Sequence, residues 1–531
     1  MKGIGLALTI SIILTIPVMA RDSRLTKPVR PGLEAKAQAG FRHAMVELGY
    51  YYQTCGGMVQ DYTKAFDWYQ RASQHKEHSA FWAIGYFYAH GMGVKNDQKM
   101  ALKWWRDAAN LGAFDIHYKN MEGFVKKAQT EYFTLLQGKV ARGDAQAMAD
   151  LGRCYQRRFG VEQRDIAMAI SMFKKSSEKG NTQAMEDLGN CYEYGDGVNK
   201  DYATAMDWYS KAAKKKSASA MARIGDLYFY AKTAGGVKDV ANALFWWRRA
   251  GDGGDSHAIY QIAQYHLERK ENSIAMLDLK KSALKGNHFA ACDLGDIYYK
   301  GEIAEKNFLE ALGWYKMASS PYSYYSYRCI GFIYYSGGHG VRQDYNAAKE
   351  WFEKAADEGD PIAMNCIGVI YCDGRLNNGE SRTFDYLMAK TWWEKAEDVF
   401  SSWSQVPKSY SWSSLNLGYI FFNGWGVDKD LEKAKEWWQK SAERGNTTAM
   451  FRLGKLYQSQ GKRYDKEAFG LFFRSANDKD SPSADAMHNL SLCYRFGHGT
   501  AKDLQQADYW EKKAQETGSD ESDAMFQLLT K

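Results

Sequence analysis

Proline is scarce in this sequence: the 531 residues include only 7, about 1% against the ~5% of an average protein. No Pro- or Ser-rich stretch separates one part of the chain from another, so we do not expect a string of domains joined by flexible linkers. Glycine is plentiful instead, with 48 residues. Few prolines and many glycines are typical of helices joined by tight turns. The 45% hydrophobic content provides a large core, which excludes a disordered or fibrous chain.

The chain also lacks a strong charge of one sign. Its formal net charge of +7 is small beside 70 basic and 63 acidic residues. Basic residues gather only in short runs such as Lys214 to Lys216. Because a general nucleic-acid binder concentrates its basic residues on one surface, we expect no nucleic-acid partner.

The N-terminus has the pattern of an export signal. Residues Gly3 to Ala20 carry no charge and are mostly apolar, Lys2 precedes them, and small residues stand at Val18 and Ala20. We predict cleavage after Ala20 and a periplasmic or secreted protein. An uncleaved membrane anchor is the alternative, because the basic residues that follow the apolar run oppose the usual positive-inside orientation. No second apolar run of 18 residues follows.

A Leu-Gly or Ile-Gly pair, with an aromatic residue three positions after the glycine, recurs along the chain with a period of about 36 residues. The anchor positions of the twelve units are Gly49, Gly85, Gly152, Gly189, Gly225, Ala263, Gly295, Gly331, Gly368, Gly418, Gly454 and Ser491. The units around Ala263 and Ser491 have lost the glycine. Such a period predicts a solenoid, in which each unit buries its apolar face only by stacking on its neighbours.

The unit around Gly189 shows how one repeat is expected to fold. Gly189 lies on the apolar stripe of a first helix, where a missing side chain permits a close helix approach. Gly195 and Gly197 end that helix in a turn that needs positive φ. Asp201 is placed to cap a second helix, which carries the aromatic pair Trp208–Tyr209. We expect one ring pair per unit to lie in the core between repeats; a stacking platform for sugars or single strands is the alternative.

The repeats resemble the Sel-one-like repeat family, a relative of the tetratricopeptide repeats. The family pattern is A-x3-L-G-x2-Y, then G-x-G-V, then D-x3-A-x2-W-Y-x-K-A-A. The second unit carries it as Ala80, Ile84-Gly85, Tyr88, Gly91 to Val94, Ala101, Trp104-Trp105 and Ala108-Ala109. The resemblance covers about residues 40–520. It implies an all-α, superhelical α/α solenoid of about twelve helix-turn-helix repeats that acts as a binding scaffold, often exported in bacteria. A cysteine-rich branch of the family has been linked to β-lactam binding.

The predicted organisation follows from the repeats and their interruptions. In order it comprises a signal peptide (1–20), a lead-in (21–39), repeats 1–2 (40–112), a helical insertion (113–145), repeats 3–9 (146–396), an aromatic insertion (397–413), repeats 10–12 (414–520) and a C-terminal capping helix (521–531).

Eight cysteines in an exported chain invite disulfides. However, Cys154 and Cys191 occupy equivalent positions of adjacent repeats, as do Cys329 and Cys366. Equivalent positions lie roughly 8–10 Å apart, whereas a disulfide needs Cα atoms within ~7 Å. We therefore expect these cysteines not to pair, which makes the cysteine-rich branch a poor match. No C-x-x-C or His/Cys cluster is present, so we expect neither a metal nor a cofactor.

Catalytic motifs are weak. The G-x-G turns follow helices and lack a G-K-[ST] ending. The S-x-x-K motifs stand without S-D-N or K-T-G, and neither G-x-S-x-G nor H-E-x-x-H occurs. We expect no enzyme; the alternative is an enzyme or binder of cell-wall or β-lactam material.

The candidate binding surface is the face of the first helices that does not carry the apolar packing stripe. It comprises the positions two, three and six residues after the alanine that begins the repeat pattern. The family resemblance implies that first helices line a concave face. Aromatic residues begin this series, acidic residues occupy its middle, and the aromatic insertion adds further rings; a plain solvated face is the alternative. The candidate residues are Trp82, Tyr86, Asp150, Glu186, Asp187, Asp226, Asp293, Asp296, Trp403, Tyr410, Trp412 and Tyr419.

These observations predict a non-catalytic protein–protein interaction scaffold of the cell envelope. Its partner would be another protein. The chain itself would act either as an adaptor for an envelope assembly or as an antagonist that neutralises a toxic effector. The sequence leaves self-association open.

Overall fold

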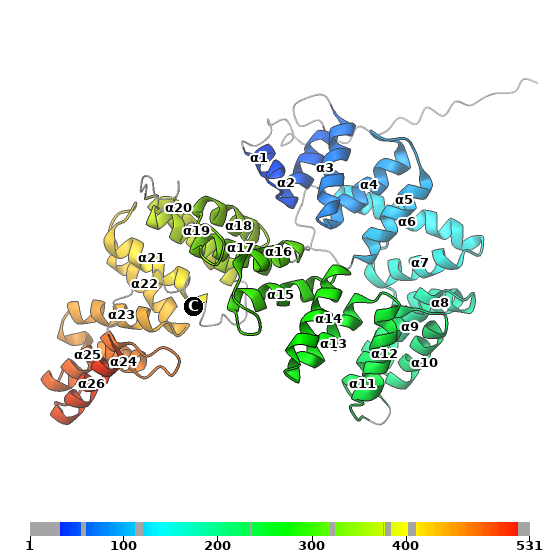
Figure 1. Cartoon of the computed structure of the whole chain (residues 1–531). Coiled ribbons are helices and arrows are strands. Elements are labelled where there is room, and N and C mark those ends of the chain that lie inside the picture. Colours follow the sequence, from blue (N-terminus) through cyan, green and yellow to red (C-terminus); the bar gives the residue numbers. More distant parts are fainter. Residues whose placement is uncertain are drawn as a thin grey trace, which may run out of the picture. The chain divides into compact units, whose positions relative to one another are not determined.

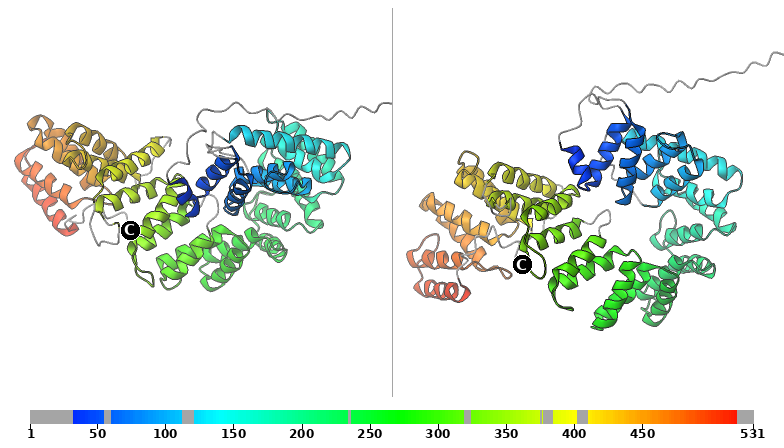
Figure 2. Two further views of the ribbon diagram at one scale, coloured as in Figure 1. Left: turned by 90° about the horizontal axis from the view of Figure 1, so that it is seen from above. Right: turned by 45° about the horizontal axis from the view of Figure 1, so that its top comes forward.

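The computed structural model describes residues 32–54, 60–111, 121–233, 236–318, 324–374, 376, 384–401 and 410–518, and within these ranges the chain forms helices and no strand (Figure 1). The predicted signal peptide and the predicted capping helix lie outside the described residues. The chain divides into two compact units, Met1–Leu188 and Gly189–Lys531. Each is a run of helices that stack on their sequence neighbours (Figure 2).

The first unit begins with a short helix and contains the first three repeats. Its helices are α1 (Leu33–Gln38), α2 (Arg42–Gln53), α3 (Tyr62–Gln74), α4 (His78–His90), α5 (Gln98–Asn110), α6 (Glu122–Ala141), α7 (Ala145–Arg157) and α8 (Ile166–Glu178). Helix α9 (Thr182–Tyr194) crosses the boundary between the units. The 20-residue helix α6 lies between the second and third repeats and is followed directly by α7, the first helix of the third repeat.

The second unit continues the alternation of first and second helices. It contains α10 (Tyr202–Lys214), α11 (Ala218–Phe229), α12 (Val240–Asp252), α13 (Ser256–Glu268), α14 (Asn272–Leu284), α15 (His288–Lys300), α16 (Phe308–Met317), α17 (Tyr324–Ser336), α18 (Tyr345–Asp357), α19 (Pro361–Asp373), α20 (Tyr386–Ser401), α21 (Trp412–Asn423), α22 (Leu431–Glu443), α23 (Thr447–Ser459), the 3₁₀ turn η3 (Lys462–Tyr464), α24 (Asp465–Ala476), α25 (Ala484–Phe496) and α26 (Leu504–Thr517). Twelve helix pairs result, and the prediction of an all-α solenoid of helix-turn-helix repeats is confirmed.

The glycine turn and the aspartate cap that the sequence predicts are present in the structure. In the fourth repeat, Gly195 and Gly197 have φ of 77° and 72° in the turn after α9. The Asp201 side chain accepts hydrogen bonds from the backbone N–H groups of Ala203 and Thr204, at 2.9 and 3.2 Å, and so caps α10. These glycines and this cap fix where each helix ends and the next begins.

The motif glycine sets the distance between the two helices of a repeat. A Cβ atom on Gly331 would lie 2.6 Å from the Phe352 ring of the following helix, and one on Gly454 would lie 2.6 Å from Phe472. Real Cβ atoms do not approach that closely, so only glycine lets the two backbones come this near.

Only one ring of each aromatic pair lies in the core, so the expectation of core pairs is half right. The buried rings are Tyr69, Trp105, Tyr209, Trp247, Tyr315, Phe352, Trp393, Trp438, Phe472 and Trp510. Adjacent helical residues point about 100° apart, which places the other ring at the edge of the core. Several of these outer rings are covered by a lysine or arginine that follows three residues later in the sequence. Lys211 Nζ, for example, lies 3.8 Å from the centroid of the Trp208 ring.

Within the described ranges, every helix is too short or too polar to cross a lipid bilayer.

The glycine–ring contact predicts opposite effects of the same substitution at two sites of the eleventh repeat. Gly454→Ala should lower the free energy of unfolding by about 1–3 kcal/mol, because its methyl group must displace Phe472. Gly470→Ala, in α24, should be neutral or raise it by up to about 1 kcal/mol, because a Cβ there meets no atom within 4 Å and alanine favours helix. Chemical denaturation followed by circular dichroism measures both; equal effects would show that the close approach is not the constraint.

Candidate protein-binding surface

Polar side chains join the first helix of one repeat to the first helix of the next. In several repeats the residue after the motif glycine contacts the residue two before the next motif glycine. These pairs are Arg153–Asp187 (3.0 Å), Gln264–Asp293 (2.6 Å), Tyr419–Arg452 (2.9 Å) and Lys455–Asn489 (3.3 Å). We call these four contacts the polar ladder. They lie on the face that the sequence analysis selected for partner binding.

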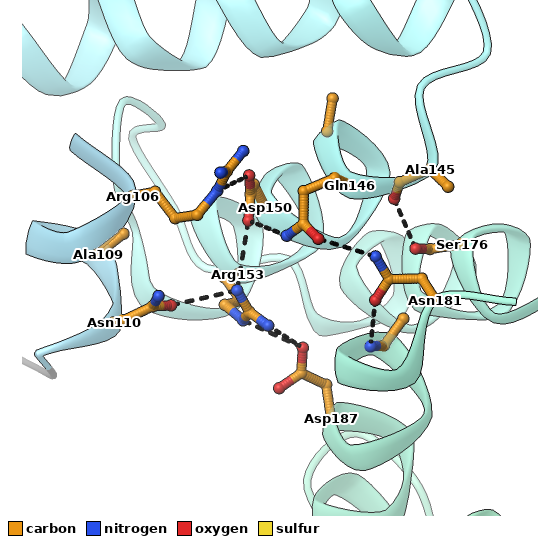
Figure 3. A network of polar contacts seen from close by, with 12 residues as sticks. Arg106, Ala109, Asn110, Ala145, Gln146, Asp150, Arg153, Ser176, Asn181 and Asp187 are labelled. Carbon is orange, nitrogen blue, oxygen red and sulfur yellow. Dashed lines mark hydrogen bonds and ion pairs between the residues drawn. The ribbon is translucent and has the colours of Figure 1, made fainter. Parts of the chain in front are cut away.

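Asp150 lies at the centre of a polar network in the first unit (Figure 3). Its carboxylate accepts a hydrogen bond from Arg106 Nε at 2.7 Å and one from Gln146 at 3.0 Å. Arg153 Nη1 lies 3.3 Å from the same carboxylate and also donates to Asn110 Oδ1 at 3.1 Å. The Asp150 side chain is buried, so its charge is satisfied within the chain.

Asp187 extends this network into α9. Arg153 Nη2 lies 3.0 Å from its carboxylate, and burial raises the pKa of Asp187 although Arg153 opposes the rise. The neighbouring Glu186 is half-buried. The acidic candidates Asp150 and Asp187 therefore hold arginines of their own chain here.

The acidic candidates of the second unit also have internal partners. Asp226 accepts a hydrogen bond from the Trp247 indole at 3.0 Å and lies 3.3 Å from His257 Nε2. The hydrogen bond to Asp226 raises the pKa of His257. Asp293 accepts from Gln264, and burial raises its pKa.

Asp296 binds two tyrosines. The Tyr315 hydroxyl donates to it at 2.6 Å and the Tyr325 hydroxyl at 2.8 Å. Tyr325 lies in the first turn of α17, and its hydroxyl is turned to Asp296.

Trp82 and Tyr86 are packed beneath other residues of the first unit. Trp82 has no exposed surface and lies against the rings of Tyr132 and Phe159, at centroid distances of 5.9 and 5.6 Å. Tyr86 is buried against Phe124 at 4.9 Å. Tyr132 and Phe124 belong to α6, so the insertion covers the first-helix face at this point. The structure gives both rings a packing role and does not present them to a partner.

The aromatic insertion is only partly described, and Trp403 lies outside the described residues. Tyr410 and Trp412 are half-buried rather than fully exposed. Tyr410 packs edge-on against Phe400 of α20 at 5.2 Å, and Trp412 begins α21. Tyr419, in the next turns of α21, is also half-buried and accepts a hydrogen bond from Arg452. The structure brings Tyr410 and Trp412 together at the start of α21, and Tyr419 lies two turns further along the same helix.

A small pocket lies where Tyr410 and Trp412 meet α19. Its lining residues are Pro361, Ile362, Asn365, Phe400, Tyr410, Trp412 and Ser413, and its cavity volume is about 10 Å³, which is room for about one water molecule. That is below the ~300–1,000 Å³ of typical small-molecule sites.

Charged residues near the pocket are held in internal pairs. Asp360, directly before Pro361, binds Arg328 at 2.7 Å. Glu397 accepts from the Ser413 hydroxyl at 2.6 Å and pairs with Arg444 at 2.9 Å. Burial alone would raise the pKa of Glu397, but the hydrogen bonds that it accepts, from Arg444 first, lower it. Glu397 is therefore ionised and locally neutralised.

Two pocket-side residues escaped the sequence analysis. Asn416 Nδ2 in α21 donates to Asn365 Oδ1 in α19 at 3.2 Å. Asn365 lies two residues after the leading alanine of its repeat, Ala363. Asn416 lies three residues after Ser413, which takes the place of the leading alanine in the next repeat. Both positions belong to the face chosen for partner binding. Their positions were thus available from the repeat pattern, but their uncharged side chains gave no compositional signal.

The described residues show little catalytic machinery. In the described ranges no group of three or more His, Cys, Asp or Glu side chains could hold a metal ion. Cys154, Cys329, Cys366 and Cys493 are buried free thiols. Burial raises the pKa of each, to about 12 for Cys329 and about 11 for Cys493, and a nucleophilic cysteine needs the opposite shift.

The helix pairs, motif glycines and polar ladder define a repeat solenoid of interaction-scaffold type. The chain matches the Sel1 repeat over residues 42–76, 80–112, 145–181, 182–217, 218–255, 288–320, 330–360, 361–398, 413–446, 447–480 and 484–514. It belongs to the Sel1 repeat family, whose members are protein-interaction scaffolds. The pair α13–α14, around Ala263, folds like the others although it falls outside these matches.

Two solved structures of repeat proteins are similar in sequence to this chain. The chain is 28% identical to c5321, described as a protective antigen of uropathogenic Escherichia coli strains with an SLR fold; the match covers 91% of this chain and 94% of that chain, with a TM-score of 0.50. It is also 28% identical to a Sel1 repeat protein from Oxalobacter formigenes, over 61% of this chain and 90% of that chain, with a TM-score of 0.40.

The network around Asp150 predicts a strong effect on stability. Asp150→Ala removes the carboxylate between Arg106 and Arg153 and leaves buried positive charge, which should lower the free energy of unfolding by about 3 kcal/mol. Glu178→Ala, at the exposed end of α8, should change it by less than about 0.5 kcal/mol. Urea denaturation of both variants measures the difference; an Asp150→Ala protein as stable as the Glu178→Ala control would contradict the structural role.

Proposed function

We propose that this protein is a non-catalytic scaffold of the cell envelope that binds another protein through the first-helix surface of α19, α21 and α23. The observation that carries the proposal is the set of half-buried rings on α21 and directly before it: Tyr410 and Trp412 line a small pocket against α19, and Tyr419 lies two turns further along the helix. Tyrosine and tryptophan are enriched among the residues that dominate binding energy in interfaces.

The surrounding charges support a protein partner. Asp360 and Glu397 are buried and paired, so docking a partner there desolvates no isolated charge. The acidic candidates on the earlier first helices have arginine, glutamine, histidine or tyrosine partners within the chain. The aromatic residues near α21 are therefore the better candidates for the contact region.

The envelope location rests on the N-terminal sequence. The uncharged segment Gly3 to Ala20 has the length and small final residues of an export signal. The similarity to a protein described as a protective antigen adds support for a role outside the cytoplasm. Within the envelope, the scaffold serves either as an adaptor for an assembly or as an antagonist that occludes a secreted effector.

The proposal predicts that capture of a partner depends on the aromatic surface. The chain, immobilised and exposed to native envelope and secreted extracts, should retain a stoichiometric protein that mass spectrometry identifies. The double variant Tyr410→Ala/Trp412→Ala should retain at least tenfold less of it, because these rings supply much of the apolar contact area.

Phe245→Ala provides the matched control, since this ring is 50% exposed on the second helix α12, away from the first-helix surface. It should retain the partner fully. Loss of capture with Phe245→Ala alone would move the site to the second helices. Retention of glycan or β-lactam probes, with no protein from any extract, would replace the proposal by the cell-wall alternative.

A further inference from the structure

The second helix α14 is apolar on both of its sides. Leu279 and Ala283 lie on the side that faces the core, with at most 1% of their surface exposed. On the opposite side Ile274 is 50% exposed, Leu277 68% and Leu284 72%. A helix that is hydrophobic all round is normally covered on every side, so this outer side of α14 has the character of a binding surface.

The repeat register shows that such an outer side is unusual in this part of the array. Two residues after the first core alanine of each second helix, α14 has Leu277 and α12 has Phe245, which is 50% exposed. The same position holds Asp207 in α10 and Glu350 in α18. The repeats on either side therefore place a charge where α12 and α14 present an apolar side chain.

The exposed apolar side chains extend over three consecutive second helices. Leu309 and Met317 of α16 are 59% and 49% exposed. Burial raises the pKa of Asp278 in α14, and Arg248 of α12 is among the cations that oppose the rise, so α12 and α14 lie close together. The term outer apolar surface is used below for Phe245, Ile274, Leu277, Leu284, Leu309 and Met317.

The exposed charges on and beside these helices are mostly positive. The exposed basic residues are Arg248, Arg249, Lys281, Lys285 and Lys316, and the exposed acidic residues are Asp252 and Glu310. Asp278, the one carboxylate of α14, is half-buried and lies 3.9 Å from His266 Nε2. A negatively charged occupant therefore complements this surface.

The large exposed fractions indicate side chains that protrude and do not line a groove. A folded protein would need a separate hollow for each of them, whereas the boundary between headgroups and acyl chains of a lipid leaflet deforms around each one. Apolar residues flanked by lysine and arginine are typical of helices that lie in the membrane interface. Anionic headgroups also attract basic residues held close to the membrane.

We propose that the outer apolar surface of α12, α14 and α16 docks this protein on an anionic lipid membrane. The apolar side chains enter the boundary between headgroups and acyl chains, and the flanking lysines and arginines lie at the lipid phosphates. Because this surface belongs to second helices, it is separate from the first-helix surface of α19, α21 and α23, and neither proposal depends on the other.

The test measures binding to vesicles by co-sedimentation. It uses the chain from Arg21 onward, which keeps every described residue and removes the apolar N-terminal segment as a second source of lipid binding. Vesicles of equal parts phosphatidylglycerol and phosphatidylcholine should bind at least tenfold more tightly than vesicles of phosphatidylcholine alone. Added salt should reduce this difference, because it screens the charges.

The variant Leu277→Ser/Leu284→Ser removes two protruding side chains from α14. It should bind the anionic vesicles at least tenfold more weakly, because less apolar surface leaves water on docking. Its midpoint of thermal unfolding should not fall, since both side chains are exposed. The matched control is Leu387→Ser/Leu504→Ser, at residues 60% and 55% exposed on α20 and α26, which should bind the vesicles as the unmodified chain does.

The variant Lys281→Gln/Lys285→Gln tests the charges separately. It should bind the anionic vesicles several-fold more weakly and leave binding to phosphatidylcholine vesicles unchanged.

Several results would overturn this proposal. Absence of vesicle binding, equal binding to both kinds of vesicle, or full binding by the double serine variant would each reject it. A dimer in sedimentation velocity that the double serine variant dissociates would assign the surface to a second copy of the chain. An envelope protein that the double serine variant alone fails to retain, without vesicle binding, would assign it to an acidic protein. Capture that depends on Tyr410 and Trp412 is measured independently of all these results.

Discussion

The contact between a motif glycine and the ring of the following helix is the constraint on which the rest of the structure depends. A missing Cβ on Gly331 or Gly454 lets the second-helix ring lie against the first-helix backbone, and the same contact recurs along the array. It fixes which side of each first helix faces its own partner helix. The opposite side is left for the neighbouring repeats, and the polar ladder forms there.

The fold follows from the sequence because its signals are local and repeated. Glycine turns, aspartate caps and the spacing of apolar residues act within one repeat, so their register alone predicts twelve helix pairs. The aromatic pairs show the limit of that register. Position along the chain marks both Trp208 and Tyr209, but only the direction of each side chain decides that Tyr209 is buried and Trp208 lies at the rim.

The candidate surface could be predicted only in part, because its contacts join different repeats. Asp150 was selected by its position, but its partner Arg106 lies 44 residues earlier on a second helix. Trp82 was selected in the same way, whereas α6, an insertion without repeat register, covers it. The pairing of a residue after one motif glycine with a residue two before the next could have been read from the sequence. It fails where an apolar residue follows the glycine, as Val369 does in α19.

The central claim is that the partner docks on the first helices near the aromatic insertion. Hydrogen–deuterium exchange of the full chain, with and without the captured partner, tests it most directly. The account predicts slower exchange on binding in α19, the start of α21 and α23, with the second helices α12 and α14 unchanged. Protection confined to second helices, or to the first unit, would contradict it.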